Sequence, residues 1–486
     1  MLAQADDGGK GLKRTLGAGN LVALGVGAII GAGLFVRTAA AAGQAAGPAV
    51  TLSFIVAAVG CAFAGLCYAE FAAMIPISGS AYAYSYVTMG ETVAWIIGWA
   101  LIMEYALGAA TVSIAWSEYL NKLLGGSIPY EWSHSPFESM TGADGILRNG
   151  IMNAPALVIL LLLTLLLIKG TQESAIVNAV IVFIKVAIVI IFIVLGWQFI
   201  RPENHTPYLI PANQPPVIDA AGKVIADSSG AFKHGWGGVL GGAAIVFFAF
   251  IGFDAVSTAA QEAKNPKRDM PIGILGSLVV CTILYILFGH VLTGVANWKD
   301  FVDPLKGREA SVAYAISTYM TGYGWLATAV TVAILAGFSS VILVMLMGQS
   351  RVFFSMANDG LLPKVFSELH PKYRTPYKSN WILFVFVGAF AAFVPGNVAG
   401  DLTSFGTLFA FVLVSAGIWI LRRKSPDMER PFKTPLVPLV PILGALICLA
   451  MIFALDAQTL KVAFAWMVLG LVVYFLYSRK HSKLND

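Results

Sequence analysis

Long apolar segments, separated by short polar ones, follow one another along almost the whole chain. Each is close to the ~20 residues that a helix needs to cross the hydrocarbon core of a bilayer. We therefore predict twelve membrane spans. They cover approximately residues 18–43, 48–76, 92–124, 151–168, 174–199, 236–263, 271–296 and 322–356, and the last four begin near residues 380, 402, 435 and 460.

The composition agrees with a membrane protein. Of 486 residues, 58% are hydrophobic and 12% are charged, whereas charged residues make up roughly a quarter of a soluble domain. The four cysteines lie inside apolar segments, without the spacing of a disulfide framework or a metal site. The net charge of +5 is spread over loops, which argues against nucleic-acid binding. We expect no cofactor, metal or catalytic group, and hence no enzyme.

The distribution of basic residues predicts the orientation, because cytoplasmic loops are enriched in Lys and Arg. With the N-terminus inside, 20 of the 31 basic residues fall on the cytoplasmic side. Both termini are then cytoplasmic, and the compact loops favour a plasma membrane of the bacterial inner-membrane type. The resulting units are an N-terminal tail (1–17), five spans (18–200), five spans (234–421), two spans (435–478) and a C-terminal tail (479–486).

The first span contains a cluster of glycines at the depth of the bilayer centre, including Gly25, Gly27, Gly31 and Gly33. Glycine costs about 1 kcal/mol relative to alanine in a helix interior, so the cluster predicts an interrupted helix. An interruption leaves free N–H groups that favour an anion and free carbonyls that favour a cation. A zwitterion would match both. The alternative is that the glycines only allow two helices to pack closely.

The sixth span is the second candidate for an interruption. Its centre reads Phe-Phe-Ala-Phe-Ile-Gly-Phe-Asp over residues 247–254, with Gly252 and Asp254 at membrane depth. Spans 1 and 6 are each the first of five, and interrupted spans at matching positions indicate an inverted-repeat transporter with its site between the repeats.

Two further charges lie deep in the membrane. Lys185 is about 18 Å from either end of the fifth span at 1.5 Å per residue, which is too deep for its ammonium to reach water easily. Burial disfavours an ammonium, so Lys185 is a candidate proton carrier; the alternative is a fixed structural cation. Glu104 in the third span is either functional or a structural hydrogen-bond anchor. Ser339 and Ser340 are candidate hydroxyl ligands of a cation, although serine pairs also occur in packed helices.

Several motifs together resemble the amino acid–polyamine–organocation transporters, and most closely the cationic amino acid transporter family in its bacterial, proton-coupled ApcT-type form. They are Gly31-Ala32-Gly33, Glu104-Tyr105, Phe250-Ile251-Gly252-Phe253-Asp254, Glu262-Ala263-Lys264-Asn265-Pro266, Pro271-Ile272-Gly273-Ile274, Arg351-Val352 and the run from Met356 to Pro363. The resemblance implies the LeuT fold: an all-α membrane protein with a 5+5 inverted repeat, broken helices 1 and 6, and two additional helices.

The resemblance and the chemistry of half-helices together assign the expected site residues. The substrate carboxylate would accept N–H groups of Gly31, Ala32 and Gly33. The ammonium would face carbonyls of Ile29, Ile30, Phe247, Phe248 and Ile251. The substrate side chain would point toward Glu104, Phe248, Ile342 and Met345. In the ApcT type a lysine matching Lys185 stands where relatives bind sodium, with Ser339 and Ser340 as neighbours; Phe248 resembles the aromatic lid, and Asp254 would tie its helix to neighbouring helices.

One position departs from the family pattern. Met345 stands where animal members have a small residue, and its thioether should shorten the side-chain pocket. We therefore expect proton-coupled symport of L-amino acids by alternating access, with small neutral substrates such as alanine preferred. The alternative is a uniporter or exchanger of arginine and lysine. The expected partners are the amino acid, protons and membrane lipids, and the sequence does not reveal whether a small membrane subunit binds.

Other classes of membrane protein fit less well. A channel would need a continuous polar pathway or filter motif, and a membrane enzyme would need a catalytic constellation at membrane depth; neither is visible. A substrate sensor without net transport would keep the binding motifs and has no need of Lys185.

Overall fold

The computed structural model is almost entirely helical. It describes residues 16–31, 33–75, 77, 79–141, 147–212, 214–218, 224–226, 230–302, 311–453, 455 and 457–483. The first half of the chain forms α1 (Ala18–Ile29), η2 (Gly33–Arg37), α2 (Thr38–Ala41), η3 (Ala42–Ala46), η4 (Gly47–Ala49), α3 (Val50–Met74), α4 (Ser80–Met89), α5 (Glu91–Leu101), η5 (Ile102–Leu107), α6 (Gly108–Leu123), η6 (Tyr130–Trp132), α7 (Ala154–Lys169), α8 (Thr171–Gly196), η7 (Trp197–Phe199) and η8 (Pro202–His205).

The second half continues the same pattern of long helices and short turns. Its helices are α9 (Gly235–Phe247), η9 (Phe248–Phe250), η10 (Phe253–Glu262), α10 (Pro266–Val295), η11 (Trp298–Phe301), α11 (Ser311–Tyr319), α12 (Gly324–Asn358), η12 (Lys364–Phe366), α13 (Tyr377–Phe393), α14 (Gly396–Lys424), α15 (Leu439–Phe453), α16 (Ala457–Val473), η13 (Tyr474–Ser478) and α17 (Arg479–His481).

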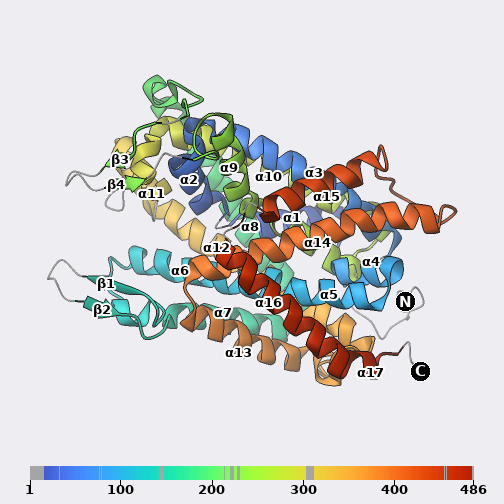
Figure 1. The fold of residues 1–486 in the computed structure, drawn as a ribbon. Coiled ribbons are helices and arrows are strands. Elements are labelled where there is room, and N and C mark those ends of the chain that lie inside the picture. Colours follow the sequence, from blue (N-terminus) through green and yellow to red (C-terminus); the bar gives the residue numbers. More distant parts are fainter. Residues whose placement is uncertain are drawn as a thin grey trace.

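Strands occur only in two short antiparallel hairpins within the described residues. In the first, β1 (Ser139–Thr141) pairs with β2 (Leu147–Asn149); in the second, β3 (Val217–Ile218) pairs with β4 (Val224–Ala226). Figure 1 shows both hairpins at one end of the molecule and α17 with α4 at the opposite end, which we call the α17 end. The long helices run between these two ends.

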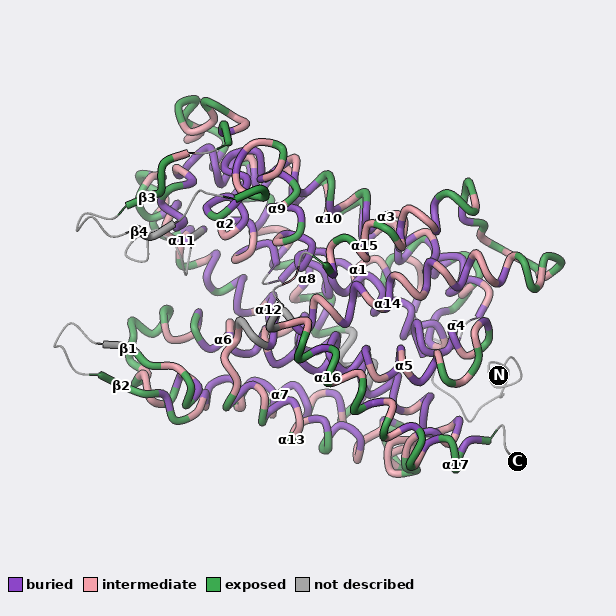
Figure 2. The backbone as a smooth tube through the Cα atoms, in the orientation of Figure 1, coloured by how far each residue is buried: buried purple, intermediate pink, exposed green. Residues whose placement is uncertain are grey.

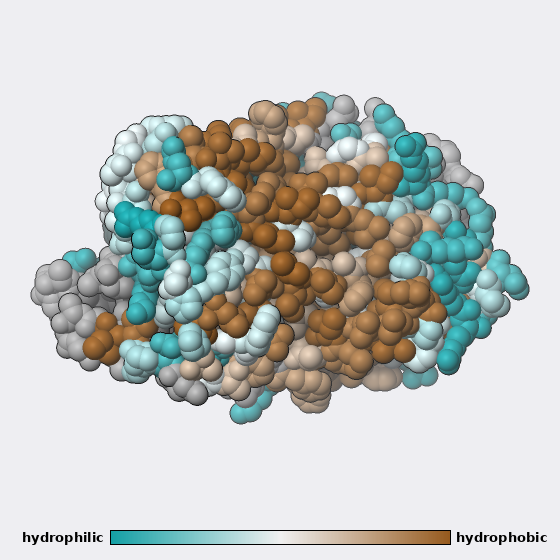
Figure 3. All heavy atoms as spheres, turned by 90° about the horizontal axis from the view of Figure 1, so that it is seen from above, coloured by the Kyte–Doolittle hydropathy of each residue, from teal (hydrophilic) through white to brown (hydrophobic). Residues whose placement is uncertain are grey.

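A broad apolar belt crosses the middle of one face of the molecule. Figure 3 shows brown, apolar atoms gathered over the centre of one face and teal, polar atoms at either end. Eight helical segments of the described chain are long and apolar enough to cross a membrane. Four further apolar helices are shorter, and they are Ala18–Ile29, Ala154–Lys169, Tyr377–Phe393 and Leu439–Phe453. The chain is thus an all-helical membrane protein, while the number of twelve crossings stays a prediction.

The helices differ in how far they lie from lipid. In the most apolar stretch of Gly324–Asn358, 83% of the residues are buried, against 17% in Thr459–His481. Figure 2 shows the corresponding colours, since pink and green predominate along α16, whereas most residues of α12 are buried. The central position of α12 places its side chains next to the interrupted first helix.

Backbone and side-chain contacts join three segments of the chain near the α17 end. The Leu16 N–H donates to the Glu262 carbonyl at 2.9 Å, and the Lys264 N–H donates to the Leu16 carbonyl at 2.8 Å. The Glu262 carboxylate also pairs with Arg351 of α12 at 2.5 Å, and both side chains are about 95% buried, with 5% and 6% exposed. The start of the described chain, η10 and α12 are therefore fastened together.

Candidate functional site

The first interruption lies directly after α1. The helix ends at Ile29, and Ile30 is extended with φ −75° and ψ 104°. Helical structure resumes at Gly33, where the N–H groups of Leu34 and Phe35 donate to the Gly31 carbonyl at 3.1 and 3.3 Å. Among the described residues, the N–H groups of Gly31 and Gly33 donate to no backbone carbonyl. The interruption thus offers donors suited to an anion; Ala32, assigned to the same role, lies outside the described residues.

The second interruption separates α9 and η9 from η10. Ile251 is extended with φ −59° and ψ 133°, and Gly252 has φ +115°, a left-handed conformation that side chains rarely adopt. A Cβ atom at Gly252 would also lie 3.1 Å from the backbone carbon and oxygen of Ala28. Glycine is therefore required here both by the backbone angle and by the close approach to α1.

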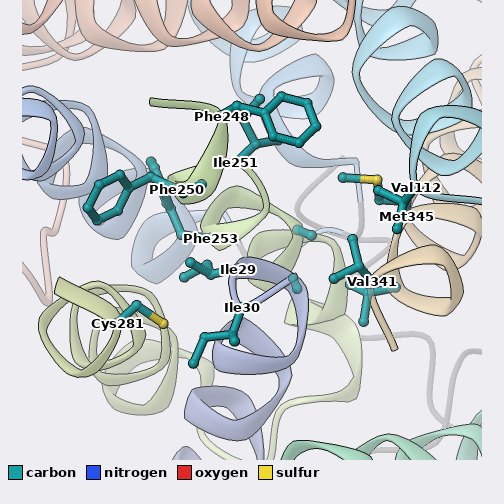
Figure 4. Close-up of a cluster of buried hydrophobic side chains, with 14 of the residues drawn as sticks. Ile29, Ile30, Val112, Phe248, Phe250, Ile251, Phe253, Cys281, Val341 and Met345 are labelled. Atoms are coloured by element: carbon teal, nitrogen blue, oxygen red, sulfur yellow. The ribbon is translucent and has the colours of Figure 1, made fainter. Parts of the chain in front are cut away.

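The two interruptions touch each other at the centre of the molecule. A Cβ atom at Gly33 would lie 2.8 Å from the Ala249 backbone nitrogen, well inside normal contact distance. The Tyr285 hydroxyl of α10 lies 2.8 Å from both the Ile29 carbonyl and the Ala249 carbonyl, and so links the two interruptions. Figure 4 shows Ile29 and Ile30 below Phe248 and Ile251.

This contact makes a strong prediction for Gly33. In Gly33→Ala the added methyl must push the backbone at Ala249 away, and overpacking of this kind typically costs 1–3 kcal/mol. We expect the initial rate of substrate uptake in proteoliposomes to fall by at least about tenfold. The matched control is Gly19→Ala, since a Cβ at Gly19 meets nothing within 4 Å. Equal uptake by the two variants would contradict the tight contact.

Lys185 of α8 lies against the first interruption. Its ammonium donates to the carbonyls of Gly27 and Ile30, at 2.6 and 2.7 Å, and the side chain is fully buried. A cation at the C-terminal end of a helix interacts favourably with the helix dipole. Lys185 therefore supplies the positive charge that the exposed carbonyls of α1 attract.

A serine and an asparagine also lie near this ammonium. The Ser340 hydroxyl lies 3.2 Å from the same Gly27 carbonyl and donates to Asn178 Oδ1 at 2.5 Å. Ser339 instead donates to the Leu335 carbonyl of its own helix at 2.9 Å. Asn178 was not expected from the sequence, although its position seven residues before Lys185 places both on one face of α8. Of the serine pair, only Ser340 joins the Lys185 site.

Apolar side chains surround the junction of the two interruptions. Figure 4 shows Phe248 and Ile251 on one side and Val341 and Met345 of α12 on the other. The sulfur of Met345 lies beside Gly108 of α6. The side chains of Ile342 and Met345 are buried, with 0% and 3% exposed, respectively. Such a lining can hold an uncharged aliphatic group without leaving a buried charge unpaired.

Two phenylalanines of the second interruption have different neighbours. Phe247 packs edge-on against Phe411 of α14, with ring centroids 6.0 Å apart. The guanidinium of Arg37 in η2 lies 5.1 Å from the centre of the Phe248 ring, which is within cation–π distance. Sequence reasoning missed Arg37, because no motif signals a contact between residues so far apart in the chain. The contact covers Phe248 and leaves it 8% exposed.

A pair of acidic side chains lies beside the second interruption. Glu104 in the π-helical turn η5 and Asp254 at the start of η10 are both fully buried. Tyr105, the neighbour of Glu104, donates its hydroxyl to Asp254 Oδ2. This hydrogen bond joins η5 to η10, while the role of Asp254 in transport stays a prediction.

Comparisons with known proteins bear on this arrangement. A family model described as amino acid permease matches residues 16–477. The branched-chain amino acid permease BcaP of Bacillus subtilis (strain 168) is 43% identical over 100% of this chain and 97% of that protein. The methylthioribose transporter of the same strain is 40% identical over 98% of this chain and 96% of that protein. Cationic amino acid transporter 4, vacuolar, of Arabidopsis thaliana is 34% identical over 87% of this chain and 65% of that protein. All three are named as permeases or transporters and not as enzymes.

Proposed function

Because the chain belongs to the amino acid permease family, we propose that it is a proton-coupled symporter of neutral L-amino acids that works by alternating access. The observation that carries the proposal is the placement of a fully buried lysine ammonium, Lys185, on the carbonyls at the end of α1. When the ammonium loses its proton, the carbonyls lose their cation and the end of α1 is free to move. The twelve spans, the LeuT arrangement and the cytoplasmic termini belong to the same proposal.

We place the substrate backbone between the two interruptions. Its carboxylate accepts N–H groups at Gly31, Ala32 and Gly33, and its ammonium donates to carbonyls of Ile29, Ile30, Phe247, Phe248 and Ile251. Tyr285 and Lys185 already donate to the Ile29 and Ile30 carbonyls, respectively. A carbonyl oxygen has two lone pairs and can accept a second donor, so these contacts are compatible with a bound ammonium.

The side chain of the substrate faces Phe248, Ile342, Met345 and Glu104. The apolar majority of these residues supports a neutral aliphatic side chain, with alanine as the preferred substrate because Met345 occupies space. Valine, leucine and isoleucine are a second candidate class, since the lining is aliphatic and the Bacillus subtilis relative is named a branched-chain amino acid permease. Phe248 acts as the lid, covered by Arg37, and Asp254 holds η10 in place.

A counterflow assay tests the proposal and its alternatives together. Proteoliposomes are loaded with one unlabelled amino acid at a time, and uptake of external radiolabelled alanine is measured. We expect alanine to drive the fastest exchange, followed by the branched-chain amino acids, and arginine and lysine to drive none. Fast exchange driven by arginine or lysine would instead favour the exchanger of cationic amino acids, and no exchange with any amino acid would favour a sensor.

The position of the carboxylate gives a separate prediction. Alaninamide lacks the anion that the free N–H groups at the first interruption attract. We expect it to compete with radiolabelled alanine at least about tenfold more weakly than alanine itself. Competition assays with alanine, its amide and its methyl ester measure this difference. If all three compete equally, the carboxylate does not bind at Gly31 and Gly33.

The proposal also includes the location of the protein and its small partners. The apolar belt places the protein among membrane lipids, and we assign it to a bacterial plasma membrane. Amino acid and proton are the small partners.

A further inference from the structure

Glu104 and Asp254 are two buried acidic residues that lie next to each other. Both side chains are 0% exposed, and each belongs to the immediate surroundings of the other. Among the described residues, neither carboxyl group takes part in an ion pair. The site therefore differs from two further buried acids, Glu70 and Glu262, which pair with Arg422 and Arg351, respectively.

Hydrogen bonds compensate only in part for the missing cation, since the Tyr105 hydroxyl and the backbone N–H groups of Asp254 and Ala255 lie close to the Asp254 carboxyl group. Tyr105 donates to Asp254 Oδ2, but Asp254 Oδ1 and both oxygens of Glu104 meet no hydrogen-bond partner among the described groups. The titratable neighbours are the phenols of Tyr68 on α3, Tyr84 on α4 and Tyr105 on η5. Thr407 of α14 is the remaining polar neighbour of Glu104. None of these groups carries a positive charge.

Two negative charges in this position would be very costly. A buried charge needs a partner of opposite charge or several hydrogen bonds, and two adjacent carboxylates repel each other. One shared proton removes one charge and provides a donor for the oxygens that otherwise have none. The geometry is thus suited to hold a proton.

We propose that Glu104 and Asp254 form a second proton-binding site, separate from Lys185, in which one proton is held between the two carboxyl groups while η10 lies against η5. This inference rests on the proposed proton-coupled transport. When η10 moves away, the carboxyl O–H bond breaks, the proton passes to water, and the pair gains one negative charge. Lys185 fastens α1 and the carboxyl pair fastens η10, so each interrupted helix has its own proton.

The elements involved fit this role. η5 continues directly into α6, which packs on the central helix α12, whereas η10 follows the interruption at Gly252 and is held at its far end by the Glu262–Arg351 pair. Asp254 is on the first turn after that interruption. A change of charge at Asp254 therefore acts at the end of η10 that adjoins the interruption, opposite the end that Glu262 and Arg351 hold.

The number of protons carried per amino acid tests the proposal. Proteoliposomes with a fixed alanine gradient are held at a series of membrane potentials, and the potential that stops net flux gives the number of protons. We expect two for the wild type and one for Glu104→Gln and for Asp254→Asn. The control Glu131→Gln, in the loop after α6, is expected to keep two. This ratio depends on driving forces and not on rates, so a slow variant still reports it.

The possible results separate the inference from the proposed function. Equal proton numbers in the wild type and both variants would overturn the second site while leaving proton coupling intact. Alanine transport without any proton in the wild type would overturn proton coupling itself. If both variants fail to fold, infrared spectroscopy of the wild type decides, because a shared proton gives the C=O stretch of a protonated buried carboxyl at neutral pH. Absence of that band would overturn the site.

Discussion

Lys185→Ala is expected to abolish the accumulation of alanine under an inward proton gradient. The variant removes the ammonium that donates to the Gly27 and Ile30 carbonyls and leaves no titratable group in its place. A proton on the Glu104–Asp254 pair does not replace this group, because the pair acts on η10, whereas Lys185 supplies the cation on which the position of the α1 end depends. We expect the final internal concentration of alanine to fall from several times the external concentration to no more than equality, as measured with radiolabelled alanine in proteoliposomes.

Lys185→Arg distinguishes coupling from a structural role. Arginine keeps a positive charge but does not release its proton in proteins. A purely structural cation would therefore be replaced by arginine with accumulation preserved, and that result would contradict the proton-carrier role. We expect Lys185→Arg to fail in accumulation as Lys185→Ala does. Lys169→Ala, at the exposed end of α7, serves as the control that retains accumulation.

Met345→Ser is expected to change which amino acids bind. In the wild type the thioether occupies the space beside Gly108, and a charged side chain of arginine length would lie unpaired among apolar groups. Serine removes most of this volume and leaves room toward α6. We expect unlabelled arginine to compete with radiolabelled alanine at least about tenfold better in the variant than in the wild type, or about 1.4 kcal/mol, while alanine is still transported.

A neighbouring methionine provides the control for this experiment. Met347 belongs to the same helix and is similarly buried, with 7% exposed against 3% for Met345, but it lies about 200° around the helix axis at ~100° per residue. Met347→Ser should leave arginine competition weak. Strong arginine competition in the wild type that is unchanged in Met345→Ser would show that Met345 does not limit the pocket, and would favour the cationic alternative.

The positions of both helix interruptions could be predicted from the sequence. Glycine stabilises a helix less than alanine does, so the glycines around Gly31 and Gly252 mark where α1 and η9 end. The depth of Lys185 also singled it out, because a charge far from both membrane surfaces must find a partner inside the protein. These inferences depend on local composition and on distance along the chain, which can be read from one sequence.

The partners of these residues could not be found in the same way. Arg37 over Phe248, Tyr285 between two carbonyls, and Asn178 beside Ser340 depend on how distant helices pack. The different behaviour of Ser339 and Ser340 has the same origin, since adjacent helix positions point about 100° apart and only one can face Lys185. From residue type alone, Ser339 and Ser340 were equally good candidates for the Lys185 site. The tertiary structure shows that Ser340 faces this site and that Ser339 bonds to its own helix.

Alanine uptake by the wild-type protein, with and without a proton gradient, tests directly whether the protein couples alanine transport to protons. Purified protein in liposomes receives radiolabelled alanine outside and an inward proton gradient. We expect accumulation above the external concentration and its complete collapse when a protonophore is added. Uptake that stops at equal concentrations, with or without the gradient and regardless of the protonophore, would contradict proton-coupled transport.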